Sequence, residues 1–216
     1  MASISVKQLK TEAGAEVKGG GNVKKVRVIE KRTFTPDNIV SIVYNMIFGF
    51  PAIIRSIFSP KTSKALREKV MLGVTAINDC RYCAWGHSHW AMINGVTLEE
   101  VNQILTGQDD SLLAEDPAEA AAILFGQHYA EHLGEIDLDS VKNLRNYFTQ
   151  TQIREIVAYV YFITFTNLSG NTVDAVLDRI KGKGRPITFF EGVVGAVLSP
   201  IPVSYTHLTL PTSDLV

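Results

Sequence analysis

Two cysteines and a histidine lie close together in the segment DCRYCAWGH, which covers residues 79–87. Cys80 and Cys83 are three residues apart, and His87 follows four residues later. In a helix, at about 100° per residue, these three side chains fall within about 60° of one another. His89 falls about 180° from Cys80, so the spacing selects His87 as the partner of the cysteines.

We expect the cysteines in the first turn of this helix, with Asn78 or Asp79 as its cap. Unpaired backbone amides and the helix dipole favour an anion there and lower the pKa of a thiol. His87 can accept the proton of Cys83, and Cys80 can attack an oxidised Cys83 to close a disulfide. The pattern therefore predicts a redox centre made of a reactive thiolate, a base and a resolving thiol.

Other uses of a cysteine pair are structural zinc binding, haem attachment and inert packing. A structural zinc site draws its ligands from two separated segments, whereas Cys80, Cys83, His87 and His89 lie within ten residues. Covalent haem attachment requires a histidine directly after the second cysteine, where this chain has Ala84. The spacing excludes haem and leaves zinc and inert cysteines as alternatives.

A second group of histidines, His128 to His132, spells the H-x-x-E-H pattern of one class of metalloprotease. Two histidines one turn apart can bind a metal, but the sequence offers no convincing third ligand. We interpret this motif as a solvated polar helix face.

The elements that must position these residues are helices. Periodic apolar positions and capping signals predict helices over residues 37–49, 63–77, 79–93, 97–106, 116–133, 139–148 and 172–181, with a new or kinked helix opening at Pro51. Segment 153–165 is apolar on all sides, and its length favours a buried central helix over a strand. The sequence therefore predicts an all-α fold.

Individual residues mark several of these boundaries. Thr97 and Glu100 form a capping box, and Gly107 ends the helix that follows. Asn167 and Asn171 flank Ser169-Gly170, where we expect a helix break with the asparagines as caps.

Composition limits the class of protein. The chain has 216 residues, a formal net charge of −1, 46% hydrophobic and 20% charged residues, which is typical of one globular domain. Balanced charge gives no reason to expect nucleic acid or an acidic membrane as a partner. The most apolar run, 40–58, is interrupted by Ser41, Asn45, Pro51 and Arg55, and no secretory signal is visible. We therefore expect no membrane span and a cytoplasmic location.

Both ends of the chain differ from its centre. We expect a flexible leader over 1–34, hinged at Gly19–Gly21, a helical domain over 35–185, and an apolar tail of unknown role over 186–203. Residues 204–216, SYTHLTLPTSDLV, look like translated read-through and not native sequence, so no element of the fold is predicted there.

A glutamate, a C-x-x-C pair and a histidine four residues after the second cysteine form a recurring signature, matched here by Glu68, Cys80, Cys83 and His87. With it the chain resembles the AhpD-like alkylhydroperoxidases of the carboxymuconolactone decarboxylase superfamily. The resemblance extends from about residue 45 to 181 and includes the segments GVTLEEV and REIVAYVYFITFTNLSGNTVDAVLDRI.

This resemblance implies an all-α homo-oligomer, commonly a trimer or hexamer, that reduces peroxides. By matching position, Cys83 would be the peroxidatic residue and Cys80 the resolving thiol, while Glu68 and His87 would form a proton relay through water. Twelve residues of helix span about 18 Å, so Glu68 must come from the preceding helix, folded back near Asn78.

The resemblance also sets the expected partners and alternatives. We expect a peroxide substrate, a dithiol or protein-thiol reductant and no bound cofactor, since no phosphate-binding glycine loop is present. Tyr82 stands where strongly active members can carry an extra histidine. The alternatives are a lactone decarboxylase of the same superfamily and a non-catalytic zinc or interaction protein.

Overall fold

The structure is a computed structural model that describes residues 31–107, 116–132 and 135–199. All regular structure in these ranges is helical, which confirms the predicted all-α fold. The helices are α2 (Pro36–Phe58), α3 (Lys64–Asn78), α4 (Arg81–Ile93), α5 (Leu98–Thr106), α7 (Pro117–Glu131), α8 (Leu138–Leu144), α9 (Gln150–Ile180) and α10 (Phe189–Leu198). Residues 1–30 of the expected leader, the expected helix stop at Gly134 and the suspected read-through at 204–216 lie outside the described residues.

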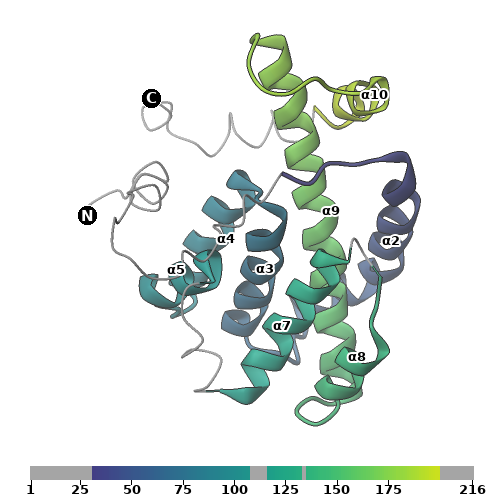
Figure 1. Cartoon of the computed structure of the whole chain (residues 1–216). Coiled ribbons are helices and arrows are strands. Elements are labelled where there is room, and N and C mark those ends of the chain that lie inside the picture. The colour runs from purple at the N-terminus through teal and green to yellow at the C-terminus, as the bar shows by residue number, and fades with distance from the viewer. Residues whose placement is uncertain (1–30, 108–115, 133–134, 200–216) are drawn as a thin grey trace, which may run out of the picture.

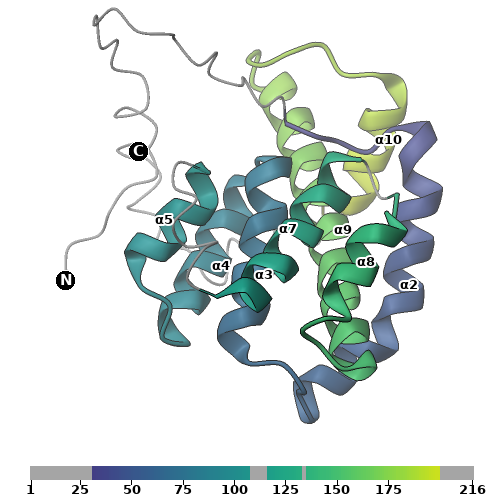
Figure 2. The same cartoon turned by 60° about the horizontal axis from the view of Figure 1, so that its bottom comes forward.

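Helix α9 lies at the centre of the fold, as Figures 1 and 2 show, and α2, α3, α4, α7 and α10 all pack against it. Its middle carries the expected buried segment, including Ile156, Val160 and Ile163, which are fully buried. These side chains join one apolar core with residues of α3 and α7 such as Val70 and Phe125. Burial of this core is the main source of stability for a fold built only of helices.

The predicted break in α9 is wrong, because the helix continues through Asn167 and Asn171. Both asparagines are buried and bond to other parts of the chain. Asn167 Oδ1 accepts a hydrogen bond from the Thr75 hydroxyl at 3.2 Å, and Asn171 Nδ2 donates to the Asn78 carbonyl at 2.7 Å. Since neither side chain competes for its own helix backbone, the helix is not interrupted.

The predicted boundary near Pro51 is also wrong, because α2 runs without interruption from Pro36 to Phe58. A proline inside a helix leaves the carbonyl four residues earlier without its donor. Pro51 and Ile47 lie on the exposed side of α2, where water can take that place. Thr35 caps the helix, and Asp37, the expected cap, lies in its first turn.

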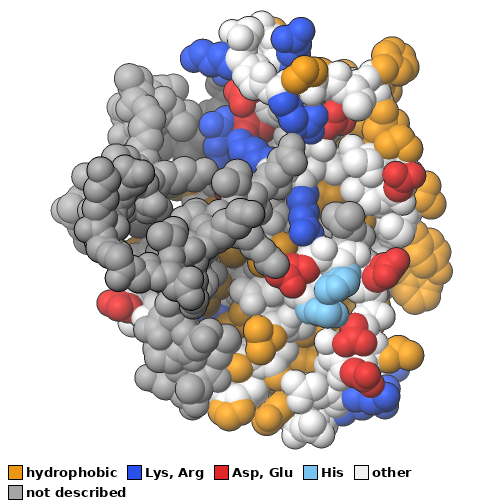
Figure 3. Space-filling model, viewed as in Figure 1, with side chains coloured by type: hydrophobic (Ala, Val, Ile, Leu, Met, Phe, Trp, Pro, Cys, Tyr) orange, Lys and Arg blue, Asp and Glu red, His pale blue; other side chains and the backbone are white. Residues whose placement is uncertain are grey.

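Helix α2 is unusual in its outer surface. By length and composition it could cross a membrane, and it is the one helix of the described ranges that could. Only 17% of its most apolar 18-residue window is buried inside the fold. Hydrophobic side chains line the right-hand edge of Figure 3, where Figure 1 places α2.

Three of the predicted helix boundaries are confirmed. Thr97 and Glu100 form the capping box of α5, and Gly107 ends that helix in the left-handed conformation, with φ 61°. Asp116 accepts hydrogen bonds from the amides of Ala118 and Glu119 at the start of α7. The polar residue that caps a helix can therefore be predicted from sequence when it bonds to backbone amides two or three residues away.

The helix start predicted at Asp139 is wrong by one residue. Helix α8 begins at Leu138, because Asp137 is the residue whose carboxylate accepts from the amides of Asp139 and Ser140. It ends at Leu144, before the predicted end at Phe148. Neighbouring aspartates compete as caps in this segment, and the sequence does not rank them.

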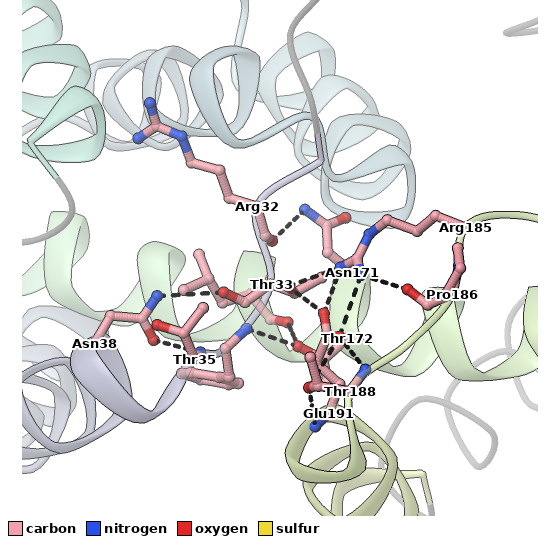
Figure 4. A network of polar contacts seen from close by, with 12 residues as sticks. Arg32, Thr33, Thr35, Asn38, Asn171, Thr172, Arg185, Pro186, Thr188 and Glu191 are labelled. Carbon is pink, nitrogen blue, oxygen red and sulfur yellow. Dashed lines mark hydrogen bonds and ion pairs between the residues drawn. The ribbon is translucent and has the colours of Figure 1, made fainter.

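The two ends of the described chain meet on α9. Phe34 is buried beside it, and α10, which lies within the expected apolar tail, packs against it. Figure 4 shows the polar network between them, in which Glu191 accepts hydrogen bonds from Thr33 and Arg185. Arg185 and the Thr188 amide hold the pKa of Glu191 at about 2 despite partial burial.

A buried lysine joins three helices and gives a prediction for stability. Lys69 of α3 donates to Glu100 of α5 at 2.8 Å and to Glu119 of α7 at 2.6 Å. Its ammonium, together with the hydrogen bonds of the Thr97 amide and hydroxyl, lowers the pKa of Glu100 from 4.5 to about 2. This contribution is present above pH 4.5 and disappears as the pH falls toward 2.

We expect Lys69→Met to lower the free energy of unfolding by about 2 kcal/mol at pH 7, because it removes the cation that both carboxylates share. The difference in the free energy of unfolding between wild type and Lys69→Met should become smaller as the pH falls from 4.5 toward about 2, measured by urea unfolding. A difference in the free energy of unfolding that does not change with pH would contradict the ion-pair explanation.

Candidate active site

The site is built on the turn between α3 and α4. Asp79 ends α3 in the left-handed conformation, with φ 53°, and Cys80 is the N-cap of α4. The prediction that Asn78 or Asp79 caps α4 is therefore wrong by one or two residues. A tight reversal needs one residue in the left-handed region, which aspartate tolerates, so the new helix begins after it.

The two cysteines face each other across the first turn of α4. Their sulfur atoms lie 2.7 Å apart, and both cysteines are free thiols. Cys80 is 1% exposed, whereas Cys83 is half-buried. Cys80 as N-cap and Cys83 as the third helical residue occupy the positions that a capping side chain and its partner normally take. The predicted pairing of the sulfurs therefore exists although Cys80 lies just outside the helix.

Hydrogen bonding separates the acidities of the two thiols. The hydrogen bond between the two sulfurs lowers the pKa of Cys80, burial opposes this, and the backbone amides of Cys83 and Tyr82 lower it further. The same bond to Cys80, together with burial, raises the pKa of Cys83 well above its usual range. The pair therefore loses one proton readily and retains the second. Because the sulfurs are in hydrogen-bond contact, movement of the shared proton places the charge on either atom.

Glu68 and His87 form the second half of the site. Glu68 lies on α3, which folds back along α4 as predicted, and its Oε2 lies 2.7 Å from His87 Nδ1. Its Oε1 accepts a 2.8 Å hydrogen bond from Arg67. Glu68 is fully buried, so its charge depends on these two partners.

Electrostatics keeps Glu68 ionised. Burial raises the pKa of Glu68, but the hydrogen bonds and charges of His87 and Arg67 outweigh it and leave the pKa below its usual value. A carboxylate bonded to one imidazole nitrogen fixes the orientation of the ring and supports a proton on it. The arrangement can hold His87 ready to exchange a proton at its other nitrogen.

The cysteine pair and the Glu68–His87 pair are adjacent units. Cys83 and His87 are one helical turn apart on α4. Among the described residues, no direct hydrogen bond joins His87 to either sulfur, so proton transfer between the units needs an intervening water or the substrate. His89 stacks on Trp85, at a ring distance of 6.2 Å, and is not bonded to Glu68.

A charged cluster beside Cys80 was not anticipated from the sequence. Asp174 of α9 is buried and bonds to Arg81, to the Tyr82 hydroxyl at 3.1 Å and to Lys31 at 2.5 Å. Arg81 also lies over the Tyr82 ring at 4.9 Å. Asp174 therefore fixes both residues between the cysteines, and its charge acts against ionisation of Cys80. This role of Asp174 could not be predicted from the sequence, because Arg81, to which it bonds, lies 93 residues away.

Asn171 holds the turn that carries Cys80. Its Nδ2 donates to the carbonyls of Asn78, at 2.7 Å, and Arg32, at 3.0 Å, as the close view in Figure 4 shows for Arg32. One side chain of α9 thus ties the end of α3 to the segment before α2. The sequence offered no signal for this contact, because both partners are backbone groups.

Gly170 allows Cys80 to approach α9. A Cβ atom at Gly170 would lie 3.1 Å from Cys80 Sγ. We therefore expect Gly170→Ala to lower the free energy of unfolding by about 1–2 kcal/mol through overpacking against a buried sulfur.

Gly86 is the matched control, because a Cβ atom added there would meet no other atom within 4 Å. At this helical position we expect Gly86→Ala to raise the free energy of unfolding by up to about 1 kcal/mol. Urea unfolding of both variants measures the difference. Equal effects would show that the Cys80 contact does not limit the residue at position 170.

The histidine motif at 128–132 lies elsewhere. His128 borders a cavity of about 400 Å³ between α7 and α8, and none of the four predicted site residues lines it. His132 Nδ1 lies 2.9 Å from the His128 carbonyl. Within the described ranges, no three histidine, cysteine, aspartate or glutamate side chains are placed to hold one metal ion.

The sequence pattern of the Carboxymuconolactone decarboxylase family matches residues 44–127 of the chain. This region begins inside α2, includes all four predicted site residues and ends inside α7. The predicted family resemblance is therefore confirmed over this region. No curated protein and no solved structure matches the chain significantly.

Proposed function

Because residues 44–127 match the sequence pattern of the Carboxymuconolactone decarboxylase family, we propose that this protein is a thiol-dependent peroxidase that cycles Cys80 and Cys83 between dithiol and disulfide. One observation carries the proposal: two free sulfurs lie 2.7 Å apart at a helix start, one turn from a buried carboxylate–histidine pair. An inert pair of cysteines needs neither the helix start nor the buried charge.

The reaction takes two steps on sulfur. The Cys83 thiolate attacks one peroxide oxygen, so that an S–O bond forms, the O–O bond breaks and an alcohol or water leaves after accepting a proton. Cys80 then attacks the sulfenic sulfur, which forms the disulfide and releases water. A dithiol or protein thiol reduces the disulfide and is itself oxidised.

Accessibility supports Cys83 as the sulfur that peroxide meets first. Cys80 is 1% exposed, and α9 closes over it at Gly170. Cys83 is half-buried and lies on the side of α4 that continues to His87. The pKa shifts favour the negative charge on Cys80, and the hydrogen bond between the sulfurs allows the proton of Cys83 to pass to Cys80, so that Cys83 attacks as the thiolate.

Glu68 and His87 have the role of a proton relay in this proposal. Ionised Glu68 supports a proton on His87, and His87 exchanges it, through water, with the leaving oxygen or with Cys83. Arg67 compensates the buried charge of Glu68, so the relay does not depend on solvent for its stability.

The test measures disulfide formation and turnover separately. The reduced protein receives one equivalent of an alkyl hydroperoxide without oxygen present, and mass spectrometry follows the loss of two hydrogen atoms from the peptide that spans residues 80–83. Steady-state peroxide consumption is then measured with dithiothreitol as the reductant. A protein that forms no disulfide and consumes no peroxide would refute the proposal.

The other outcomes point to the remaining alternatives. Turnover of a lactone by a variant with both cysteines replaced by serine would indicate the decarboxylase reaction. One equivalent of zinc, lost on replacement of either cysteine, would indicate a structural metal site.

A further inference from the structure

We propose that the outer face of α2 is a self-association surface, on which two copies of this chain pair their α2 helices antiparallel about a two-fold axis. The proposal does not use the cysteine site and holds or fails independently of the peroxidase function. It rests on the apolar surface of α2, on the amount of that surface and on the order of its side chains.

Helix α2 is apolar on both sides but buried on one. Its inner face packs on α9 through Ile42, Gly49 and Ile53, and Asn45 on this helix donates to the Tyr129 hydroxyl at 3.0 Å. Its outer face presents large apolar residues to solvent: Val40, Tyr44, Ile47, Phe48, Phe50, Ile54, Ile57 and Phe58. A helix that is hydrophobic all round is normally buried all round.

The exposed area is sufficient for a stable dimer. The eight side chains are between 40% and 83% exposed. Phe50 and Ile57 point away from the row along which the helices would pair, and at about 150–200 Å² for a fully exposed large side chain the other six leave roughly 700 Å² of apolar surface open. A standard stable interface buries about 800 Å² on each partner, whereas the largest apolar patch on a monomer is about 300–600 Å².

The order of residues along one row of this face fits a two-fold axis. Asp37, Tyr44, Phe48 and Arg55 are separated by seven, four and seven residues, and at about 100° per residue they fall within about 40° of one another. This spacing is symmetric about a point at the level of residue 46. Tyr44 and Phe48 already stack on each other, at a ring distance of 5.6 Å.

Antiparallel pairing about that point brings opposite charges together. Each Asp37 then meets the partner's Arg55, and each Tyr44 meets the partner's Phe48. Asp37 and Arg55 are exposed, and they are the only charged residues of α2. A two-fold interface requires a surface patch that is complementary to itself, and this row of four residues meets that requirement.

A lipid surface fits the same helix less well. Helices that lie in a membrane surface carry many lysines and arginines beside the apolar face, whereas α2 has a single arginine. Insertion across a membrane would strip the inner face of α2 from α9. The observations therefore favour a second copy of the chain.

Sedimentation equilibrium of the full chain at about 1–100 µM tests the proposal. We expect an even number of copies and at least a hundredfold weaker association for Ile47→Glu, which places two like charges near the axis. Leu138→Glu changes an equally accessible apolar residue, 72% exposed on α8, and should leave association unchanged. A monomer or a trimer at the highest concentration, or equal effects of the two variants, would overturn the proposal.

A charge exchange tests the antiparallel arrangement even if Ile47→Glu does not fold. Asp37→Arg and Arg55→Asp should each weaken association about tenfold, and the double variant should restore it to near the wild-type value. Failure of the double variant to restore association would exclude this pairing. A monomer that binds phosphatidylcholine vesicles, and loses binding in Ile47→Glu, would instead assign the face to lipid and overturn the proposal.

Discussion

Replacement of Cys83 by serine is expected to lower dithiothreitol-dependent peroxide consumption by at least about 100-fold. Serine keeps the size and hydrogen bonding of the side chain but is a far weaker nucleophile at neutral pH. The first step of the proposed reaction then has no thiolate at the accessible position. The initial rate of hydroperoxide loss, with the rate of dithiothreitol alone subtracted, is the measurement.

Cys80→Ser is the matched variant, because it makes the same chemical change 2.7 Å away. It should keep the first oxidation step and lose the disulfide. We therefore expect sulfenic acid on Cys83, followed by sulfinic and sulfonic acid as peroxide is added, all visible by mass spectrometry. Full activity of Cys83→Ser with oxidation of Cys80 would reverse the two roles, and full activity of both variants would exclude the pair.

Glu68→Gln is expected to lower the same rate by about 10–100-fold while the protein keeps its fold. Glutamine can accept a hydrogen bond from His87 but carries no charge to support a proton on the ring. The disulfide should still form when one equivalent of peroxide is added slowly, since the sulfurs are not moved.

The effect of Glu68 should also depend on pH in a defined direction. The pKa of Glu68 is below its usual value of 4.5, because its bonds to His87 and Arg67 outweigh the effect of burial. Wild type should therefore retain its advantage over Glu68→Gln at about pH 5 and lose it only below pH 4.5. Equal rates of the two proteins at neutral pH would remove Glu68 from the relay.

Two substitutions control for burial and for residue type. Glu155 is as fully buried as Glu68 but bonds to the backbone amides of Lys61 and Thr62, so Glu155→Gln should change stability and leave the catalytic rate of the folded protein unchanged. His89→Gln should keep the wild-type rate, whereas His87→Gln should resemble Glu68→Gln. Stability is measured alongside each rate by thermal unfolding.

Sequence alone predicted the parts of the fold that local chemistry specifies. The starts of α5 and α7 could be predicted because Thr97 and Asp116 bond to amides two or three residues away. The continuity of α9 could not, since Asn171 and Asn167 resemble caps until their partners in other helices are known. In α9, long-range partners therefore decided the outcome where local propensity pointed elsewhere.

The candidate site shows the same division. Helical spacing placed Cys83 and His87 on one side of α4, and the length of α3 required Glu68 to fold back toward them. The contacts around Cys80 could not be predicted from the sequence. Asp174, Asn171 and Gly170 belong to α9 and lie about 90 residues further along the chain. No sequence motif marks a residue such as Gly170, whose role is to leave room for another side chain.

The central position of α9 has a consequence for how this chain can be divided. The family region ends at residue 127, so it contains Cys80 and Cys83 but none of the helix that encloses them. If the chain were cut at residue 127, Cys80 would face water on the side where Gly170 now lies. The carbonyl of Asn78 would also lose the hydrogen bond that Asn171 donates. Residues 44–127 thus lack the helix that encloses Cys80, and any domain graft or fragment complementation must include α9.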